Sequence, residues 1–373
     1  MKLILICEGK NITVNQISQL LGAAGSNTSL SISNAQGRPQ AELIPVISAA
    51  GSKKIAIDVD ASMASLNQTL ALFNAANGPN ASFALREANG LPPQHVATVF
   101  AALGNKVLSA QLNAARAVQE QALNFLNSAN GNNTSLTISA VNAYSDQGCR
   151  ALLGAVGSKR FTAQIPGDRA TPAQVLNILG FAGGPNTSIA LSNANRLPSQ
   201  YLSQIFAAAG GKALVADFDV TQMNMGTLKQ LIASAGPNTR VSLNTAQAMN
   251  NADMREILQL AGSRSIDVNL NGAQLNTGQL KATVEAASGN ASITVNTAHA
   301  ASLNEILSAV SASAHTNLTL QYNGAQLVAT PTDGNYVVRA IQAAKPGTTI
   351  VLNSIGVIQF NMALLLDIIR AAG

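Results

Sequence analysis

The side chains that most often carry catalysis are few in this sequence and lie far apart. Its histidines are His95, His299 and His315, and its cysteines are Cys7 and Cys149. No pair of them has the short spacing of a metal-binding or nucleophile–base motif such as H-E-x-x-H. We therefore interpret the histidines as surface or packing residues and expect no catalytic cysteine.

Four aspartates are the remaining candidates for a cation site. Asp58 and Asp60 share one segment, and Asp217 and Asp219 share another that is distant in the sequence. The many glycines recur at regular intervals and do not form a phosphate-binding loop. The sequence thus predicts no metal, no cofactor and no enzyme. An enzyme whose site lies on a loop is the alternative.

Five basic residues recur at intervals of 52 or 53 residues, and they are Lys53, Lys106, Lys159, Lys212 and Arg264. Such a stripe could bind an anion, namely an acidic partner, a lipid surface or a phosphate backbone. Alternatively, each cation lies just after a helix and complements the exposed carbonyl groups at its end. We favour the second interpretation because salt screens such charges from one another.

These intervals belong to a repeat that fills the chain. Clusters of small residues end in Gly every 26 or 27 residues, from Gly25 to Gly289, and the series continues to Gly373. The chain therefore holds 14 units, and one longer interval predicts an insertion near residues 329–335. Two unit types alternate, so the paired repeat is about 53 residues long. We expect one repeat domain over residues 1–373.

The unit types differ at their first residue. First-type units open with an asparagine: Asn27, Asn80, Asn133, Asn186, Asn238 and Asn290. Second-type units open with the basic residues of the stripe.

Each unit reads as a strand followed by a helix. Alternation such as that from Ile55 to Asp60 predicts a half-buried strand, and Thr171-Pro172 predicts a helix start. The final Gly predicts close packing and a left-handed stop. Stacked units bury their strand and helix faces together. The expected fold is α/β: a curved solenoid (horseshoe) of about 14 βα repeats, with a parallel sheet on the concave side and helices outside.

The composition agrees with such a repeat and limits the function. Charged residues make up 10% and aromatic residues 3%, with no Trp, and the net charge is +5. This mild excess argues against nucleic acid as a partner, and no apolar run is long enough for a membrane span. The start of the chain lacks a signal-peptide pattern. We expect a cytoplasmic protein, or one secreted into a host cell without a signal peptide.

The second unit type resembles the leucine-rich repeat, in which a strand of pattern L-x-L-x-x-N lines a horseshoe. Matching residues are Leu108, Ala110 and Asn113, then Ile266, Val268 and Asn271, then Leu318, Leu320 and Asn323. In the first type, Ala35, Ala88, Ala194, Ala246 or Ala298 takes the Asn place. The two-type alternation is similar to that of ribonuclease-inhibitor-like horseshoes. An independently evolved βα solenoid is the structural alternative.

The resemblance implies partner binding on the concave face, and the family includes secreted bacterial effectors that bind host proteins. Strand alternation predicts which side chains point there. The candidate partner-binding residues are Asp58, Asp60, Gln111, Asn113, Gln164, Asp217, Asp219, Arg240, Asn244, Asp267, Asn269, Asn271 and Gln321. We predict a non-enzymatic interaction scaffold for a protein or peptide. Alternatively, these side chains merely suit solvated strands.

The two ends of the chain are apolar where a repeat protein usually carries a polar cap. The last helix is apolar nearly all round from Met362 to Ile369, and the first strand, Leu3 to Cys7, is no more polar. This predicts a homodimer through a terminal repeat, or a structural protein that assembles through its ends. Alternatively, one apolar face packs inward.

Overall fold

The computed structural model describes residues 1–103, 106–129, 133–313, 316–324, 326, 331–356 and 361–373. Its internal contacts divide the chain into two compact units, which are described separately. Unit 1 comprises Met1–Ala56, Gly78–Asn80 and Leu243–Gly373, and unit 2 comprises Ile57–Asn77 and Ala81–Ser242. A single repeat domain over residues 1–373 stays a prediction.

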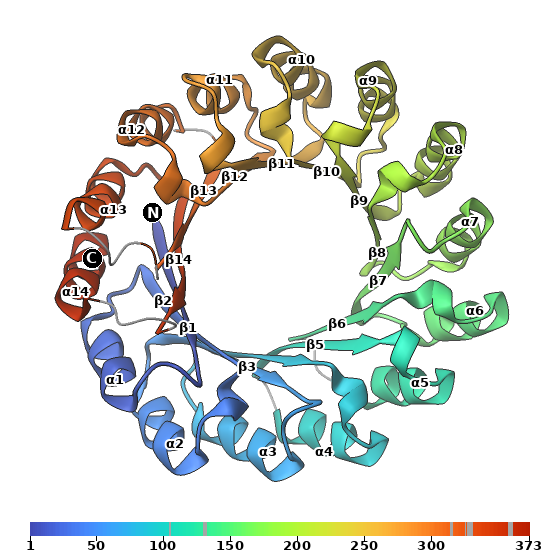
Figure 1. Cartoon of the computed structure of the whole chain (residues 1–373). Helices are drawn as coiled ribbons and strands as arrows, with labels where there is room; N and C mark the ends of the chain where they lie inside the picture. The colour runs from blue at the N-terminus through green and yellow to red at the C-terminus, as the bar shows by residue number, and fades with distance from the viewer. Residues whose placement is uncertain (104–105, 130–132, 314–315, 325, 327–330, 357–360) are drawn as a thin grey trace. The chain divides into compact units, whose positions relative to one another are not determined.

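Strands and helices alternate along the described residues (Figure 1). The strands are β1 (Lys2–Glu8), β2 (Thr28–Ser33), β3 (Lys54–Asp60), β4 (Ala81–Arg86), β5 (Val107–Asn113), β6 (Thr134–Ser139), β7 (Arg160–Pro166), β8 (Thr187–Ser192), β9 (Ala213–Asp219), β10 (Thr239–Asn244), β11 (Ser265–Asn271), β12 (Ala291–Asn296), β13 (Asn317–Asn323) and β14 (Thr348–Ile355). The helices are α1 (Val14–Ala23), α2 (Gln40–Ala49), α3 (Leu66–Ala75), α4 (Pro93–Leu103), α5 (Gln119–Ser128), α6 (Asp146–Ala155), α7 (Pro172–Phe181), α8 (Ser199–Ala209), α9 (Met225–Ser234), α10 (Asn251–Ala261), α11 (Gln279–Ala286), α12 (Leu303–Ala312), α13 (Pro331–Ala343) and α14 (Met362–Ala372).

Short 3-10 helices follow many of the strands. They are η1 (Ala35–Gly37), η2 (Ala88–Gly90), η3 (Ala114–Arg116), η4 (Val141–Ala143), η5 (Ala194–Arg196), η6 (Val220–Gln222), η7 (Ala246–Ala248), η8 (Gly272–Gln274) and η9 (Ala298–Ala300).

The succession confirms the predicted fold class, because 14 strands each precede a helix in the described residues. This is the repeating βα organisation that the sequence indicated. The insertion predicted near residues 329–335 falls partly outside the described residues, and the rest of it opens α13. A search of the described residues for membrane spans finds no helix that is both long and apolar enough.

All the strand pairs in each unit are parallel, and the helices lie on one face of the sheet (Figure 1). Unit 1 has the order β11-β12-β13-β14-β1-β2, and unit 2 has β4-β5-β6-β7-β8-β9. The register aligns buried residues, so Leu136 of β6 lies between Ala110 of β5 and Phe161 of β7. The core is therefore one layer between sheet and helices, repeated from unit to unit.

The first and last strands are neighbours, which agrees with the alternative that the apolar terminal segments pack inward. In β1, Leu3 pairs with Ile350 of β14 on one side and with Thr28 of β2 on the other. The other edge of β14 pairs with β13, and α1 packs against α14. Apolar terminal segments are thus buried against each other and need no polar cap. A dimer or assembly through a terminal repeat stays a prediction, and it could not use an edge of β1 or β14, because both edges of each strand are paired.

The repeat glycines have two different roles. Those that end first-type units have a left-handed backbone, with φ between 51 and 59° at Gly51, Gly157, Gly210 and Gly262. This confirms the predicted left-handed stop. Those that end second-type units have no room for a side chain: a Cβ on Gly184 would lie 2.8 Å from the carbonyl oxygen of Gly157. Gly78 meets Gly51 in the same way, and Gly25 meets the final residue, Gly373. The end of the chain therefore takes the place of a preceding repeat.

Left-handed backbone conformations also occur at non-glycine residues, at the point where each first-type strand turns into its 3-10 helix. The residues with a left-handed backbone there are Asn34, Glu87, Ala140, Asn193, Thr245 and Thr297. Asparagine tolerates this conformation, whereas alanine at φ 54° is disfavoured by about 1–2 kcal/mol.

We expect Ala140→Gly to raise the free energy of unfolding by about 0.5–1 kcal/mol, because glycine removes this strain. The same change at Ala151, an exposed position in α6, should lower it by about 1 kcal/mol. Urea denaturation followed by circular dichroism measures both. Equal losses for the two variants would contradict the strain at Ala140.

Candidate binding surfaces

The face of the sheet opposite the helices, here called the helix-free face, carries the predicted partner-binding row. Asp58 lies between the buried residues Ile57 and Val59, and the other predicted residues alternate with buried ones in the same way. Most are half-buried, and Arg240 is exposed. Their orientation agrees with the prediction, and their role in binding stays a prediction.

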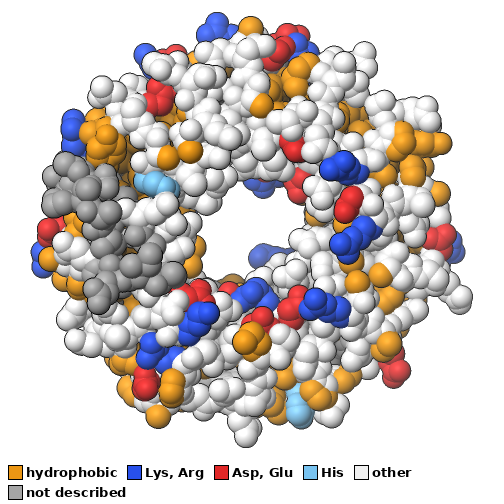
Figure 2. Space-filling model, in the orientation of Figure 1, with side chains coloured by type: hydrophobic (Ala, Val, Ile, Leu, Met, Phe, Trp, Pro, Cys, Tyr) orange, Lys and Arg blue, Asp and Glu red, His pale blue; other side chains and the backbone are white. Residues whose placement is uncertain are grey.

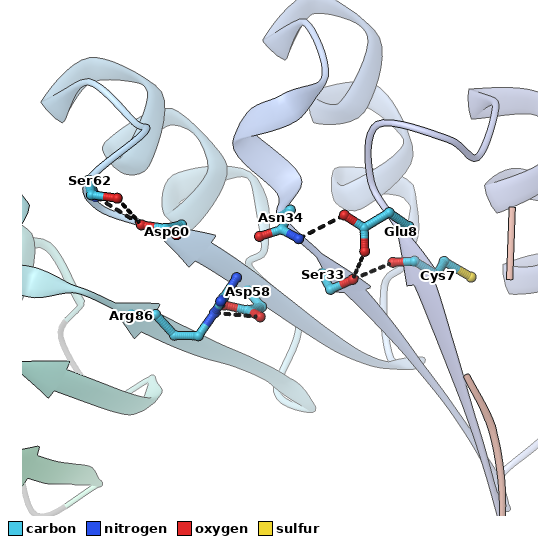
Figure 3. Close-up of polar contacts among 8 residues, drawn as sticks. All are labelled: Cys7, Glu8, Ser33, Asn34, Asp58, Asp60, Ser62 and Arg86. Carbon is cyan, nitrogen blue, oxygen red and sulfur yellow. Dashed lines mark hydrogen bonds and ion pairs between the residues drawn. The ribbon is translucent and has the colours of Figure 1, made fainter. Parts of the chain in front are cut away.

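The last residue of several second-type strands is engaged with its own turn. Asp60 Oδ1 accepts the N–H of Ser62 at 3.0 Å (Figure 3). Asn113, Asp219 and Asn271 likewise accept the N–H two residues further on. The Asn of the leucine-rich-repeat pattern thus caps the turn that follows its strand.

Other predicted residues are held by partners on neighbouring strands. Arg86 of β4 donates through Nε to Asp58 Oδ1 at 2.8 Å (Figure 3). Asn269 Nδ2 donates to Asn244 Oδ1 at 2.9 Å. By contrast, Gln111, Gln164 and Gln321 have no side-chain hydrogen bond to any residue in the described part of the chain. These glutamines have the most donor and acceptor capacity left for a partner.

A further carboxylate on the sheet, Glu8 at the end of β1, was not singled out from the sequence. It accepts hydrogen bonds from Ser33 Oγ at 2.9 Å and from Asn34 Nδ2 at 2.7 Å (Figure 3). Ser33 and Asn34 lie on and just after β2. Both carboxylate oxygens are therefore used to join β1 to β2.

A polar ladder joins the 3-10 helices to the next repeat. Asn195 Oδ1 of η5 accepts the N–H of Asp219 at 3.1 Å. Asn89, Gln247 and His299 take the same role for Asn113, Asn271 and Asn323, always 24 residues further on. His299 is thus a packing residue, as interpreted from the sequence.

The ladder is interrupted at Asn142 of η4. The residue 24 positions further on is Pro166, which has no N–H to donate, and the buried Asn142 Oδ1 has no partner among the described atoms.

The basic stripe mostly lies against helix ends. Lys106 Nζ donates to the carbonyl of Phe73 in α3 at 2.6 Å. Lys53 reaches Ala24 at the end of α1, and Lys212 reaches Leu179 in α7. Arg264 donates to Leu260 in α10 at 3.3 Å, and Lys159 is half-buried. These contacts support the structural alternative, and anion binding by the stripe stays a prediction.

The asparagines that open first-type units bond to the turn one repeat before. Asn186 Nδ2 donates to Ser158 O at 2.9 Å, and Asn80 does the same to Ser52 O at 2.7 Å. Asn27 makes this bond to Ala372 O at 3.4 Å. The contact that joins inner repeats therefore also joins the first repeat to the last.

Both cysteine thiols are buried. Burial raises the pKa of the Cys7 thiol to about 12. Burial and the nearby Asp146 carboxylate raise that of Cys149 to about 11. Both are free cysteines, and both are neutral at physiological pH because their pKa values lie well above it. In the described part of the chain, no group of three or more His, Cys, Asp and Glu residues could hold a metal ion.

One open cavity lies at the carboxyl ends of β7, β8 and β9 in unit 2, with a volume of about 480 Å³. It is lined by Asp168, Asn193, Asn195, Arg196, Asp219 and Gln222. Figure 2 shows basic and acidic side chains next to each other over these strand ends. The sequence does not reveal this site, because its walls come from three repeats. Of its lining, only Asp219 is among the candidate residues predicted from the sequence.

Among solved structures, the chain is similar to several proteins at low sequence identity. No protein-family model matches the chain, and no curated protein matches it by sequence. A chain in the crystal structure of the yeast Rad7–Elc1 complex is similar over 91% of this chain and 88% of its own length, with 14% identity and a TM-score of 0.45. The aldolase QR15 is similar over 52% and 90%, with 10% identity and a TM-score of 0.28. Likenesses this weak carry no argument about activity or partners.

Replacing Lys212 by Met should lower the free energy of unfolding by about 1 kcal/mol, because a charged hydrogen bond to α7 is lost. Lys345→Met, at an exposed lysine, is the control and should have little effect. Chemical denaturation measures the difference. If Lys212→Met leaves stability unchanged but abolishes retention on phosphocellulose, the stripe serves anion binding instead.

Neither thiol should react with Ellman's reagent at pH 8 in the native protein, and two should react in 6 M guanidinium. The reason is that the raised pKa values keep both thiols protonated and burial blocks access. Absorbance at the released thiolate band counts the thiols. Rapid reaction of either cysteine in the native protein would contradict this result and would favour a nucleophilic role for that thiol.

Proposed function

We propose that the protein is a non-enzymatic interaction scaffold that binds a protein or peptide partner on its helix-free face. The observation that carries the proposal is the strand alternation: buried residues face the helices, and half-buried polar residues face the other way on successive strands. Backbone pairing holds this polar row at a regular spacing of about 4.8 Å per strand.

The residues of the polar row differ in whether their side chains already make hydrogen bonds within the protein. Gln111 on β5 and Gln164 on β7 have no described partner, so their amides can bond to a ligand without breaking an internal contact. Each amide offers both donors and acceptors, which suits a peptide backbone. We therefore place the centre of the binding region around β5–β7.

The proposed interaction is of modest strength. Tight interfaces usually contain Trp, Tyr or Arg anchors, whereas this chain has no Trp and the large Phe residues in the described core are buried. Binding energy would be spread over many small polar contacts. A role as a bacterial effector that acts on a host protein rests on the family resemblance alone and stays a hypothesis.

The test is a double substitution, Gln111→Arg with Gln164→Arg, which adds bulk and charge to the helix-free face. Peptides selected on the wild type from a displayed library should bind the double variant at least about tenfold more weakly, because the added side chains cover the row. Biolayer interferometry measures the affinities.

The matched control carries the same change on exposed helix positions, Gln94→Arg in α4 with Gln204→Arg in α8. This variant should bind as the wild type does. The proposal fails if no selected peptide distinguishes the two double variants.

A further inference from the structure

The cavity at the carboxyl ends of β7–β9 lies beside a strand that no 3-10 helix follows. Strands β8 and β9 are followed by the 3-10 helices η5 and η6, whereas no 3-10 helix stands between β7 and α7. Instead Gly167 packs directly on β8, where its N–H donates to Ser192 O at 2.7 Å. Gly167 and Asp168 form a turn in which the N–H of Arg169 donates to Pro166 O at 3.0 Å, and the cavity lies between this turn and η5.

Strand β1 is likewise followed by no 3-10 helix, and there a side chain of the next repeat bonds to the turn. There Gly9 donates to Ser33 O at 2.7 Å. Arg38, just after η1, donates to the carbonyls of Gly9 and Lys10 at 2.8 and 3.2 Å. The residue just after η5 is Leu197, which is buried in the core. The turn after β7 therefore receives no such bond from the equivalent residue.

One wall of the cavity is held rigidly by hydrogen bonds. Asn195 Nδ2 donates to Gln222 Oε1 at 3.3 Å, and Gln222 Nε2 donates to Asp219 Oδ2 at 3.1 Å. The N–H of Asp219 donates back to Asn195 Oδ1 at 3.1 Å. This cycle of three side chains fixes the carboxylate and both amides before any ligand arrives, which lowers the entropy cost of binding.

The charges of the lining alternate from strand to strand. Arg196 follows β8 and stands, in strand order, between Asp168 after β7 and Asp219 at the end of β9. Arg196 is exposed and its guanidinium has no hydrogen bond or ion pair among the described residues. Asp168 has only a weak pairing with Arg169, at 3.9 Å. No aromatic side chain lines the cavity, so ring stacking contributes nothing to ligand choice.

We propose that this cavity binds a small zwitterion of the amino acid or short peptide class. The guanidinium of Arg196 takes the ligand carboxylate, since its planar fork matches that group, and Asp168 takes the ammonium group. Arg196 and Asp168 follow neighbouring strands and line the same cavity, so one small ligand can contact both. A neutral polyol would leave both charges unpaired. The inference does not depend on the helix-free face.

The test uses glycylglycine as the probe and saturation-transfer NMR on the full chain. We expect saturable binding with a dissociation constant below about 1 mM. N-acetylglycylglycine, glycylglycinamide and trehalose should each bind at least about tenfold more weakly, because each lacks one or both charges. Equal binding of trehalose, or no saturable glycylglycine binding, would overturn the proposal.

Two variants locate the site. Arg196→Gln and Asp168→Asn should each weaken glycylglycine binding about tenfold, with an unchanged unfolding temperature because both side chains are exposed. Arg160→Gln, at the exposed opposite end of β7, is the matched control and should bind as the wild type does. Undiminished binding in the two cavity variants, or equal loss in the control, would place the ligand elsewhere and refute the inference.

Discussion

Parallel backbone pairing between neighbouring strands fixes the distance between repeats, and every other contact has to fit within that distance. At the helix-to-strand turns the fit is so close that Gly184 has no room for a side chain above the carbonyl of Gly157. The Asn and Lys side chains that open the units then bond to the turn or helix end of a neighbouring repeat. The composition follows from this spacing, which favours small residues, amides and few charges.

The same constraint governs the ends of the chain. Because β1 pairs with β14 in register, Gly373 can meet Gly25 as Gly51 meets Gly78. Asn27 can likewise reach Ala372 as Asn186 reaches Ser158. The apolar last helix is therefore a packing element, and the candidate binding residues lie on the sheet and not at the ends of the chain.

The sequence was enough to predict what repeats locally. Alternation located the strands and the polar face, and Thr171-Pro172 marked the start of α7, where Thr171 makes the capping box. It was not enough for contacts between distant residues. Nothing local indicates that β1 has β14 as a partner, and the cavity joins turns from three repeats. The Asn row was recognisable as a periodic feature, but its bonds to the preceding turn required coordinates.

The two proposed binding surfaces share one scaffold. On the helix-free face, regular pairing presents a periodic row of short polar groups, which suits an extended partner. At the carboxyl ends of β7–β9 lies a cavity with an unpaired guanidinium. The helix-free face and the cavity are lined by different residues apart from Asp219, so substitutions at the other residues can alter one surface without the other.

The central claim is that the first and last repeats are held by the same contacts as inner ones. Native-state hydrogen exchange tests it most directly, because an amide in a stable strand pair exchanges only when the pair opens. The account predicts that amides of β1 paired with β14, and the helical amides of α14, exchange as slowly as those of β12 and α12. Fast exchange confined to β1 and α14, with protected inner repeats, would contradict it.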